Sequence, residues 1–490
     1  MLFSSVEFLL IFLPLLLFVF HILREKGKEQ YLLPVLIVGS LVFYAVWDWR
    51  YIFLLLFSVF TNYQIGKYLQ RNPTKLILTL GVIVNLLLLG YFKYAGFLVD
   101  NVISLGGSLT FEAPILPLAI SFFTFQQIAF LVDVYKQKIT ITSKSEYLLF
   151  VVFFPQLIAG PIVHYRDLQP QFSQLMLGQL APSFGKGLAY LAIGLGKKLY
   201  IADPLAVYVD PIFLAVDAGQ SIHAIEGVVG WMGYTMQLYF DFSAYGDMAI
   251  GIALLFGVTL PINFNSPYKA SSIIEFWRRW HITLGDFLRD YLYIPMGGSK
   301  QGWLKKYNNL LITMLLGGLW HGAAWTFVFW GVLHGVMLIV NHLLNAVWQR
   351  LGVEGNKLLK DVGIAITFLG VSLSWVFFKA DTFTGALSVF DSLTQVGSLS
   401  KESLVQFKAN NTLDVFGAII LLFQALVIVF VFPNSHRLIT LMGDKTVNWH
   451  DRIYRMAKHP VIAVCLGGAF FFLGKELLAV PSAEFLYFNF

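Results

Sequence analysis

The stretch GGLWHGAAWTFVFWGVLHG, residues 317–335, carries two histidines in a run that is otherwise apolar enough to lie inside a membrane. If a helix enters the membrane at Lys306, His321 lies fifteen residues further along it. At ~1.5 Å per residue this is roughly 22 Å, beyond the middle of a hydrocarbon core about 30 Å thick. An ionisable side chain at that depth is costly and marks a functional site. We therefore expect His321 to act in the interior of the protein.

Small residues surround this histidine, namely Gly317, Gly318, Gly322, Ala323 and Ala324. They permit two interpretations, either close packing of helices or space through which a substrate chain reaches the imidazole. The glycine pair also argues against an unbroken helix up to His321. A neutral imidazole is a competent general base near neutral pH. His334 lies in a longer regular run, where a hydrogen-bonded packing role fits at least as well as a functional one.

The composition indicates a polytopic membrane protein. Of its 490 residues, 57% are hydrophobic and only 13% are charged, whereas a soluble domain is about a quarter charged. We expect an all-α protein with about eleven membrane spans and some re-entrant pieces, forming one membrane-embedded unit. Its single cysteine, Cys465, excludes an intrachain disulfide and a cysteine-based metal cluster.

Basic residues follow every second crossing in the first part of the chain, which predicts that those loops are cytoplasmic and that the N-terminus lies outside. The basic loops follow spans ending near residues 23, 66 and 133, and they contain Arg24, Lys26, Lys28, Lys67, Arg71, Lys75, Lys136, Lys138 and Lys144. The net charge of +6 is explained by these loops and requires no nucleic acid. We see no internal repeat of the kind that transporters use.

The longest polar stretch, residues 263–308, predicts a cytoplasmic helix from about residue 271 to 293. Ser271 or Ser272 caps it, with Glu275 in its first turn. Positions with 4-3-4-3 spacing predict one aromatic and apolar stripe, made by Trp277, His281, Leu284, Leu288 and Tyr291. Its arginines fit either an interfacial helix that meets lipid phosphates or a surface that binds an anionic cofactor such as coenzyme A. His281 itself fits a structural role equally well.

A second polar group lies in QLYFDFSAYGDMAIG, residues 237–251, where Asp241 and Asp247 stand in apolar sequence. Six residues do not return to one face of a straight helix, so we expect a bend between Ser243 and Gly246. The carboxylates fit a proton relay, a metal site, or partners for histidine and arginine. Because no metal-ligand spacing such as HExxH occurs, we expect no metal.

Several long motifs together resemble the membrane-bound O-acyltransferases, and within them the bacterial alginate O-acetylation branch. They are SFFTFQQIAFLVDVYK (121–136), FFPQLIAGPIVHYRDL (153–168), YFDFSAYGDMAIG (239–251), EFWRRWHITLGDFLRDYLYIPMGG (275–298), GGLWHGAAWTFVFWGVLHG (317–335), WVFFKAD (375–381) and the terminal FLYFNF. The similarity runs nearly end to end, although His164 stands where the family pattern has arginine. It implies a ring of tilted helices around a funnel, in which cytoplasmic acyl donor meets an acceptor from outside.

The resemblance places the family's catalytic histidine on His321 and a second funnel histidine on His281. For the donor, acetyl-CoA, we expect contacts from Arg278, Arg279, Trp277, Asp241, Asp247, Asn265 and Trp320. Within a single domain of residues 1–490, we expect N-terminal helices over 1–136, a catalytic core over 137–380 and C-terminal helices over 381–490. The terminal FLYFNF fits membrane-interface anchoring slightly better than partner docking.

These expectations define an enzyme of the bacterial cytoplasmic membrane that O-acetylates an extracytoplasmic polysaccharide, most simply an alginate-like one, through a secreted partner. No Ser-His-Asp or reactive cysteine arrangement points to an acyl-enzyme. Cellulose, peptidoglycan or teichoic acid are alternative acceptors. Two other classes stay open: a proton-coupled exporter of an activated acyl group, since acidic and histidine residues in spans suit a carrier, and a scaffold for a polysaccharide synthase.

Overall fold

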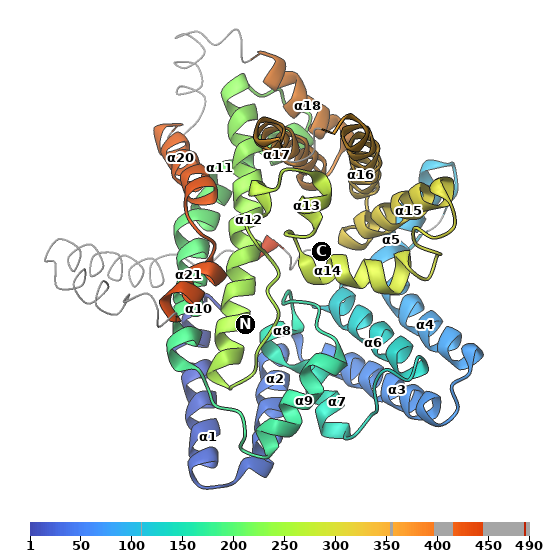
Figure 1. The fold of residues 1–490 in the computed structure, drawn as a ribbon, viewed down its shortest axis with the longest axis vertical. Coiled ribbons are helices and arrows are strands. Elements are labelled where there is room, and N and C mark those ends of the chain that lie inside the picture. The colour runs from blue at the N-terminus through green and yellow to red at the C-terminus, as the bar shows by residue number, and fades with distance from the viewer. Residues whose placement is uncertain (109, 353–355, 396–414, 444–484, 487–490) are drawn as a thin grey trace, which may run out of the picture. The chain divides into compact units, whose positions relative to one another are not determined.

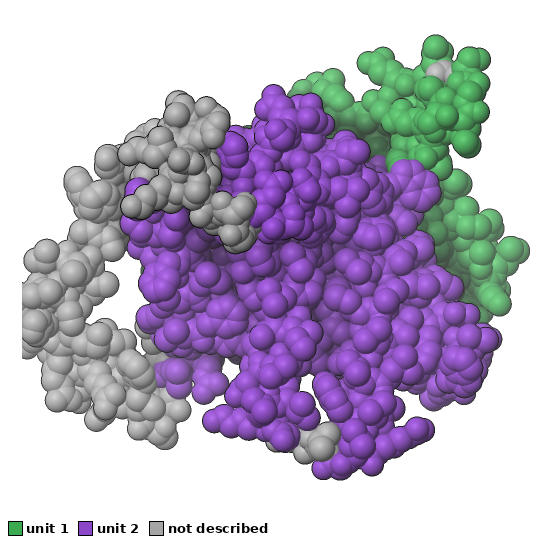
Figure 2. Space-filling model, turned by 90° about the horizontal axis from the view of Figure 1, so that it is seen from above, with its two compact units in different colours: residues 1–193, 245–262, 480–490 green, residues 194–244, 263–479 purple. Residues whose placement is uncertain are grey.

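The computed structural model describes residues 1–108, 110–352, 356–395, 415–443 and 485–486. Within these residues the ordered elements are all helices, which confirms the all-α expectation. The chain forms two compact units, shown in different colours in Figure 2. Unit 1 comprises residues 1–193, 245–262 and 480–490, and unit 2 comprises residues 194–244 and 263–479. Cys465 and the predicted span at 460–479 lie outside the described residues.

Unit 1 is built mainly from the helices of the first part of the chain, drawn from blue to green in Figure 1: α1 (Leu13–Glu25), α2 (Leu32–Asp48), α3 (Tyr51–Arg71), α4 (Lys75–Leu89), α5 (Ala95–Ser104), α6 (Ile120–Tyr135), α7 (Lys144–Val152), α8 (Phe154–Leu157) and α9 (Tyr165–Met176). Helix α3 packs on α4 and α6. A reciprocal pair of amide hydrogen bonds between Asn62 and Asn85, 2.7 and 3.1 Å long, links α3 to α4. Such buried amide pairs stabilise helix contacts where lipid offers no alternative partner.

Unit 2 contains α11 (Asp203–Asp217) and the later helices α13 (Ile273–Trp277), α14 (Ile282–Leu288), α15 (Trp303–His321), α16 (Trp325–Leu351), α17 (Lys357–Lys379), α18 (Phe383–Thr394), α20 (Val415–Val431) and α21 (Ser435–Gly443). Helices α15 and α16 pack along one another, and α16 also contacts α17 and α13. Two helices run from one unit into the other, α10 (Phe184–Lys197) and α12 (Ala224–Leu255).

Seven helical segments of the described chain are long and apolar enough to cross a membrane, or eight if one bent pair counts as a span. They are Phe8–Glu25, Glu29–Asp48, Lys75–Ser104, Phe184–Asp217, Ala224–Leu255, Trp325–Leu351, Lys357–Lys379 and the pair Phe416–Val431 with Ser435–Leu441. The expected eleven spans also include helices α3 and α6, which are too polar or too short to be counted here, and the run at 460–479, which lies outside the described residues. Other expected spans combine or break. The runs at 224–240 and 246–260 are one helix, and the run at 147–163 forms the short helices α7 and α8.

The expected bend between the two aspartates of residues 237–251 is wrong. Helix α12 continues from Ala224 to Leu255, and it is almost wholly buried. A straight helix turns about 100° per residue, so Asp241 and Asp247 face different directions from it. A helix that is buried on all sides is apolar all round. It therefore lacks the 3.6-residue alternation of polar and apolar residues from which a continuous helix could have been predicted.

Candidate functional site

His321 is the last residue of α15, and its side chain is buried, with 2% of its surface exposed. The helix is unbroken through Gly317 and Gly318, contrary to the interruption that these glycines indicated. Gly322 takes an extended conformation, and α16 begins at Trp325. His321 therefore lies at the tip of a helical hairpin, just before its tight turn.

The glycines of this hairpin allow the two helices to touch. A Cβ on Gly318 would collide with the carbonyl oxygen of Phe327, and one on Gly331 would collide with that of Met314. A Cβ on Gly322 would overlap the ring of Phe327. Of the two interpretations of the small residues, close helix packing is therefore confirmed at these positions.

Aromatic rings enclose the imidazole of His321. Phe378 lies 5.0 Å away between ring centroids, Trp320 also 5.0 Å, and Trp330 lies perpendicular at 5.3 Å. The ring of His281 is 6.5 Å away. The structure thus brings together both histidines and Trp320 of the predicted site, with the rings of Trp330 and Phe378 beside them.

The predicted single helix over 271–293 is wrong in its middle. It starts as expected, because the hydroxyl of Ser272 accepts a hydrogen bond from the Glu275 backbone N–H. It then stops at Trp277, and a second helix starts at Ile282. Between them His281 adopts a left-handed conformation with φ of 42°, which non-glycine residues take only at a cost. The continuous stripe expected from 4-3-4-3 spacing therefore does not form.

The break is held by the segment around Asn263. Its backbone carbonyl accepts from the Ile282 N–H at 3.0 Å, and its Oδ1 faces the Thr283 N–H at 3.2 Å. A backbone N–H can only donate, so this contact identifies Oδ1 as the oxygen of the Asn263 amide. The same oxygen lies 3.2 Å from Nδ1 of His281. His281 must therefore carry its proton on Nδ1, which leaves the lone pair on Nε2.

His281 lies between two short helices, outside the membrane-crossing segments, and its side chain is fully buried. This burial lowers the pKa of His281 to about 3, because desolvation disfavours the imidazolium. The ring is neutral at physiological pH, so its Nε2 lone pair is retained. Sequence reasoning missed Asn263, although its place in the polar loop before the arginine-rich segment was a usable signal.

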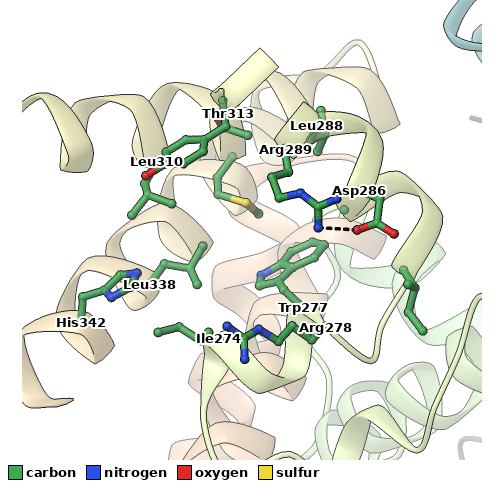
Figure 3. A pocket seen from close by; sticks show the side chains of 14 residues that line it. Ile274, Trp277, Arg278, Asp286, Leu288, Arg289, Leu310, Thr313, Leu338 and His342 are labelled. Carbon is green, nitrogen blue, oxygen red and sulfur yellow. Dashed lines mark hydrogen bonds and ion pairs between the residues drawn. The ribbon is translucent and has the colours of Figure 1, made fainter. Parts of the chain in front are cut away.

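The two short helices that flank His281, α13 and α14, border a cavity of about 380 Å³, shown in Figure 3. Its wall includes Trp277 and Arg278 from the predicted donor site, and Arg289 paired with Asp286 at 2.7 Å. Arg278 is exposed, and it forms no ion pair within the described residues. The cavity therefore offers one uncompensated positive charge beside a mixed polar and apolar wall.

Arg279 differs from its neighbour. It is bound to Glu275 at 2.6 Å and does not line the cavity. Although burial acts in the opposite direction, hydrogen bonds from Ser271 and the charge of Arg279 lower the pKa of Glu275. Arg278 and Arg279, which were both expected to bind the donor, therefore have different surroundings. Only Arg278 lines the cavity.

Three other residues expected at the donor site lie elsewhere. Asp241 pairs with the buried Lys198 at 2.7 Å, and Lys198 also pairs with Asp203 at 2.8 Å. Asn265 accepts a hydrogen bond from Asn434 at 2.8 Å. Asp247 belongs to the part of α12 in unit 1. None of the three lines the cavity next to Arg278.

His334 is fully buried, and its Nε2 lies 2.9 Å from the hydroxyl oxygen of Ser374 on α17. This nitrogen thus makes the hydrogen bond that a packing role requires. In the described part of the chain there is no cluster of three or more His, Cys, Asp or Glu side chains placed to hold a metal ion. At the chain's end, Phe485 is buried and packs on Tyr245 within unit 1, whereas residues 487–490 lie outside the described residues.

Comparison with known proteins agrees with this geometry. The model of the membrane-bound O-acyltransferase family matches residues 133–352, a range that contains both histidines and the cavity. The chain is 42% identical over 434 residues to the peptidoglycan O-acetyltransferase of Helicobacter pylori, which covers 82% of this chain and 81% of that protein. It is 41% identical over 412 residues to a probable alginate O-acetylase, AlgI, of Pseudomonas aeruginosa, covering 81% and 76%. A teichoic acid D-alanyltransferase of Bacillus subtilis is 27% identical over 249 residues, covering 48% and 61%.

Proposed function

Because this chain belongs to the membrane-bound O-acyltransferase family, we propose that it transfers acetyl groups from cytoplasmic acetyl-CoA to hydroxyl groups of an extracytoplasmic polysaccharide. The observation that carries this proposal is the buried imidazole of His321 beside His281, whose two flanking helices border the cavity that contains Arg278. Two relatives at about 40% identity are named as a peptidoglycan O-acetyltransferase and a probable alginate O-acetylase, which supports the same reaction class.

His321 acts in this scheme as the general base. It accepts the proton of the attacking hydroxyl while the hydroxyl oxygen forms a bond to the thioester carbonyl carbon. The tetrahedral intermediate then collapses, the carbon–sulfur bond breaks, and the coenzyme A thiolate leaves and takes up the proton. This role requires the neutral imidazole, because an imidazolium has no lone pair with which to accept a proton. His281 contributes a second acceptor, its Nε2 lone pair.

The donor enters next to Arg278. An exposed guanidinium suits the phosphate groups of coenzyme A, since its planar N–H groups match phosphate oxygens. Trp277 lines the same cavity and supplies an apolar wall. This arrangement supports donor binding at Trp277 and Arg278, and it gives Arg279, Asp241, Asp247 and Asn265 supporting roles at most.

The acceptor is proposed only as a class. Identities of 42% to a peptidoglycan enzyme and 41% to an alginate enzyme do not distinguish the two polymers. We place the protein in the bacterial cytoplasmic membrane with a secreted partner that carries acetyl groups to the polymer. Co-purification from crosslinked cells tests the partner, and full acetylation of purified polysaccharide by this chain alone would contradict it.

The decisive experiment is a His321→Ala variant. We expect it to insert and fold, because alanine is compatible with the end of a helix, while acetyl transfer falls by about a hundredfold or more. Radiolabelled acetyl-CoA with purified protein measures release of free coenzyme A and labelling of acceptor. His223→Ala, which removes an imidazole from the loop before α12, is the control and should keep wild-type activity.

The same assay separates an enzyme from a carrier. A carrier would move label across the bilayer of a proteoliposome without releasing coenzyme A. Wild-type rates from His321→Ala, at equal amounts of inserted protein, would contradict the proposed role of this residue.

A further inference from the structure

Three aromatic rings with polar ring nitrogens meet beside His321. The ring centroid of His334 lies 4.6 Å from that of Trp330 and 5.3 Å from that of Trp277, and the two indoles are 5.9 Å apart. They come from α13 and α16, which contact one another in unit 2. We call these three side chains the ring-nitrogen cluster.

The tautomer of His334 follows from its neighbour. The hydroxyl of Ser374 donates its single proton to the carbonyl oxygen of Val371 at 2.6 Å. Its oxygen can therefore only accept from Nε2 of His334, which lies 2.9 Å away. The proton of His334 must be on Nε2, and its Nδ1 carries a lone pair.

The cluster has unused hydrogen-bonding capacity. Within the described residues, Nδ1 of His334 and Nε1 of both Trp277 and Trp330 are buried without a hydrogen-bond partner. The cluster thus combines two N–H donors with one acceptor. Buried polar groups in this state are costly and are normally satisfied by a water or a ligand.

The location of the cluster indicates which ligand could bind to its ring nitrogens. Trp277 also lines the cavity that contains Arg278, as Figure 3 shows. Trp330 packs perpendicular to His321 at 5.3 Å. The cluster therefore connects the proposed phosphate-binding side of the donor site with the proposed catalytic base.

We propose that the ring-nitrogen cluster is a subsite for a secondary amide in the pantetheine arm of the acyl donor. An amide presents a carbonyl oxygen to an indole N–H and an N–H to the lone pair of His334, which matches the donors and the acceptor of the cluster. Coenzyme A carries secondary amides between its phosphates and its thiol, the stretch that must lie between Arg278 and His321. This inference rests on the proposed function and adds a specificity determinant to it.

Small donors that lack phosphates test the subsite directly. S-acetyl-N-acetylcysteamine contains one amide, and S-ethyl thioacetate contains none. The wild-type protein should prefer the amide-bearing donor in kcat/KM, and Trp277→Phe should reduce that preference about threefold to tenfold, the worth of one neutral hydrogen bond. His334→Leu should do the same, whereas His334→Gln, with both an amide N–H and a carbonyl, should retain more of the preference.

Trp231→Phe is the matched control. Trp231 lies on α12, and its Nε1 is likewise buried without a partner among the described residues, but it does not line the cavity. Calorimetry with coenzyme A gives a readout independent of turnover. Trp277→Phe should weaken binding about threefold to tenfold, and Trp231→Phe should leave it unchanged.

The outcomes separate the two proposals. If the wild-type protein transfers acetyl from neither small donor nor from acetyl-CoA, the proposed function fails. If it uses acetyl-CoA while both small donors react equally and Trp277→Phe binds coenzyme A as the wild type does, the cluster holds water only and the amide subsite is wrong.

Discussion

At the residue scale, the chemistry of the site depends on which nitrogen of each histidine carries a proton. Asn263 fixes the proton of His281 on Nδ1, and the amide orientation is itself fixed by a backbone N–H. The left-handed backbone at His281 directs the ring toward this partner at a conformational cost. We infer that Asn263 is a positioning residue that acts through His281.

An Asn263→Asp variant tests this role by its pH dependence. A carboxylate beside the Nδ1–H group favours the imidazolium, so it should raise the pKa of His281 above about 3. Below the raised pKa, Nε2 is protonated and its lone pair is lost. We therefore expect kcat of the variant to fall, as the pH is lowered, at a higher pH than kcat of the wild type.

Asn263→Leu removes the acceptor and should lower kcat at every pH with little change in the KM for acetyl-CoA. Superimposable pH profiles of wild type and Asn263→Asp would show that His281 takes no part in the reaction.

The two neighbouring arginines give a second test at this scale. Arg278→Ala should raise the KM for acetyl-CoA about threefold to tenfold, because an exposed charge at the cavity is lost. Arg279→Ala serves as the matched control, since its charge is already bound to Glu275. Calorimetry with coenzyme A measures the same difference. Equal donor affinity in both variants would identify these residues as lipid anchors.

At the element scale, the hairpin of α15 and α16 positions His321 through contacts between helix backbones. The main-chain atoms at Gly318 and Gly331 approach one another so closely that neither residue has room for a Cβ. The site therefore depends on helix spacing as much as on the histidine. A change that separates the helices should move the imidazole without altering its chemistry.

Gly331→Ala should accordingly reduce activity by more than tenfold and lower the melting temperature, because overpacking costs about 1–3 kcal/mol. Gly196→Ala on α10 is the control. Nothing lies within 4 Å of a Cβ at that position, so alanine should be neutral or stabilising there. Melting followed by intrinsic fluorescence, together with the acetyl-transfer assay, measures both effects. Unchanged melting of Gly331→Ala would show that the hairpin relaxes.

Some features of these helices could be predicted from the sequence, and others could not. The helical class, the cap at Ser272 and the pairs Glu275–Arg279 and Asp286–Arg289 follow from local spacing, and the structure has them. The break before His281 depends on hydrogen bonds from a segment eighteen residues earlier. The spacing of apolar residues within the helix carries no information about such contacts. The continuity of α12 was concealed because a helix buried on every side has no apolar face to detect.

At the scale of the whole molecule, the proposed reaction needs opposite faces for donor and acceptor. By the positive-inside rule, the basic loops after α1, α3 and α6 predict that those helix ends lie on the cytoplasmic side. The N-terminus and the loop after α5 then lie outside. This orientation is a prediction that the proposed direction of transfer requires.

Cysteine labelling in intact cells tests the orientation. In a Cys465→Ser background, Ser104→Cys should react with a membrane-impermeant maleimide. Lys28→Cys and Lys136→Cys should react only after permeabilisation, although all three positions are exposed on the protein. Labelling of Lys28→Cys in intact cells would invert the topology and, with it, the proposed entry side of the donor.

The residues of the proposed site come from one continuous part of the chain. Asn263, the two histidines of the proposed reaction, the cavity and the ring-nitrogen cluster all lie between residues 263 and 378. Recombination outside this interval leaves the reaction centre intact while it exchanges the surrounding helices. On the proposed function, we therefore expect the choice of polymer to depend on residues outside this interval. A chimera that carries residues 263–378 of this chain in a relative's flanking helices should keep the donor preference of one parent and the acceptor preference of the other.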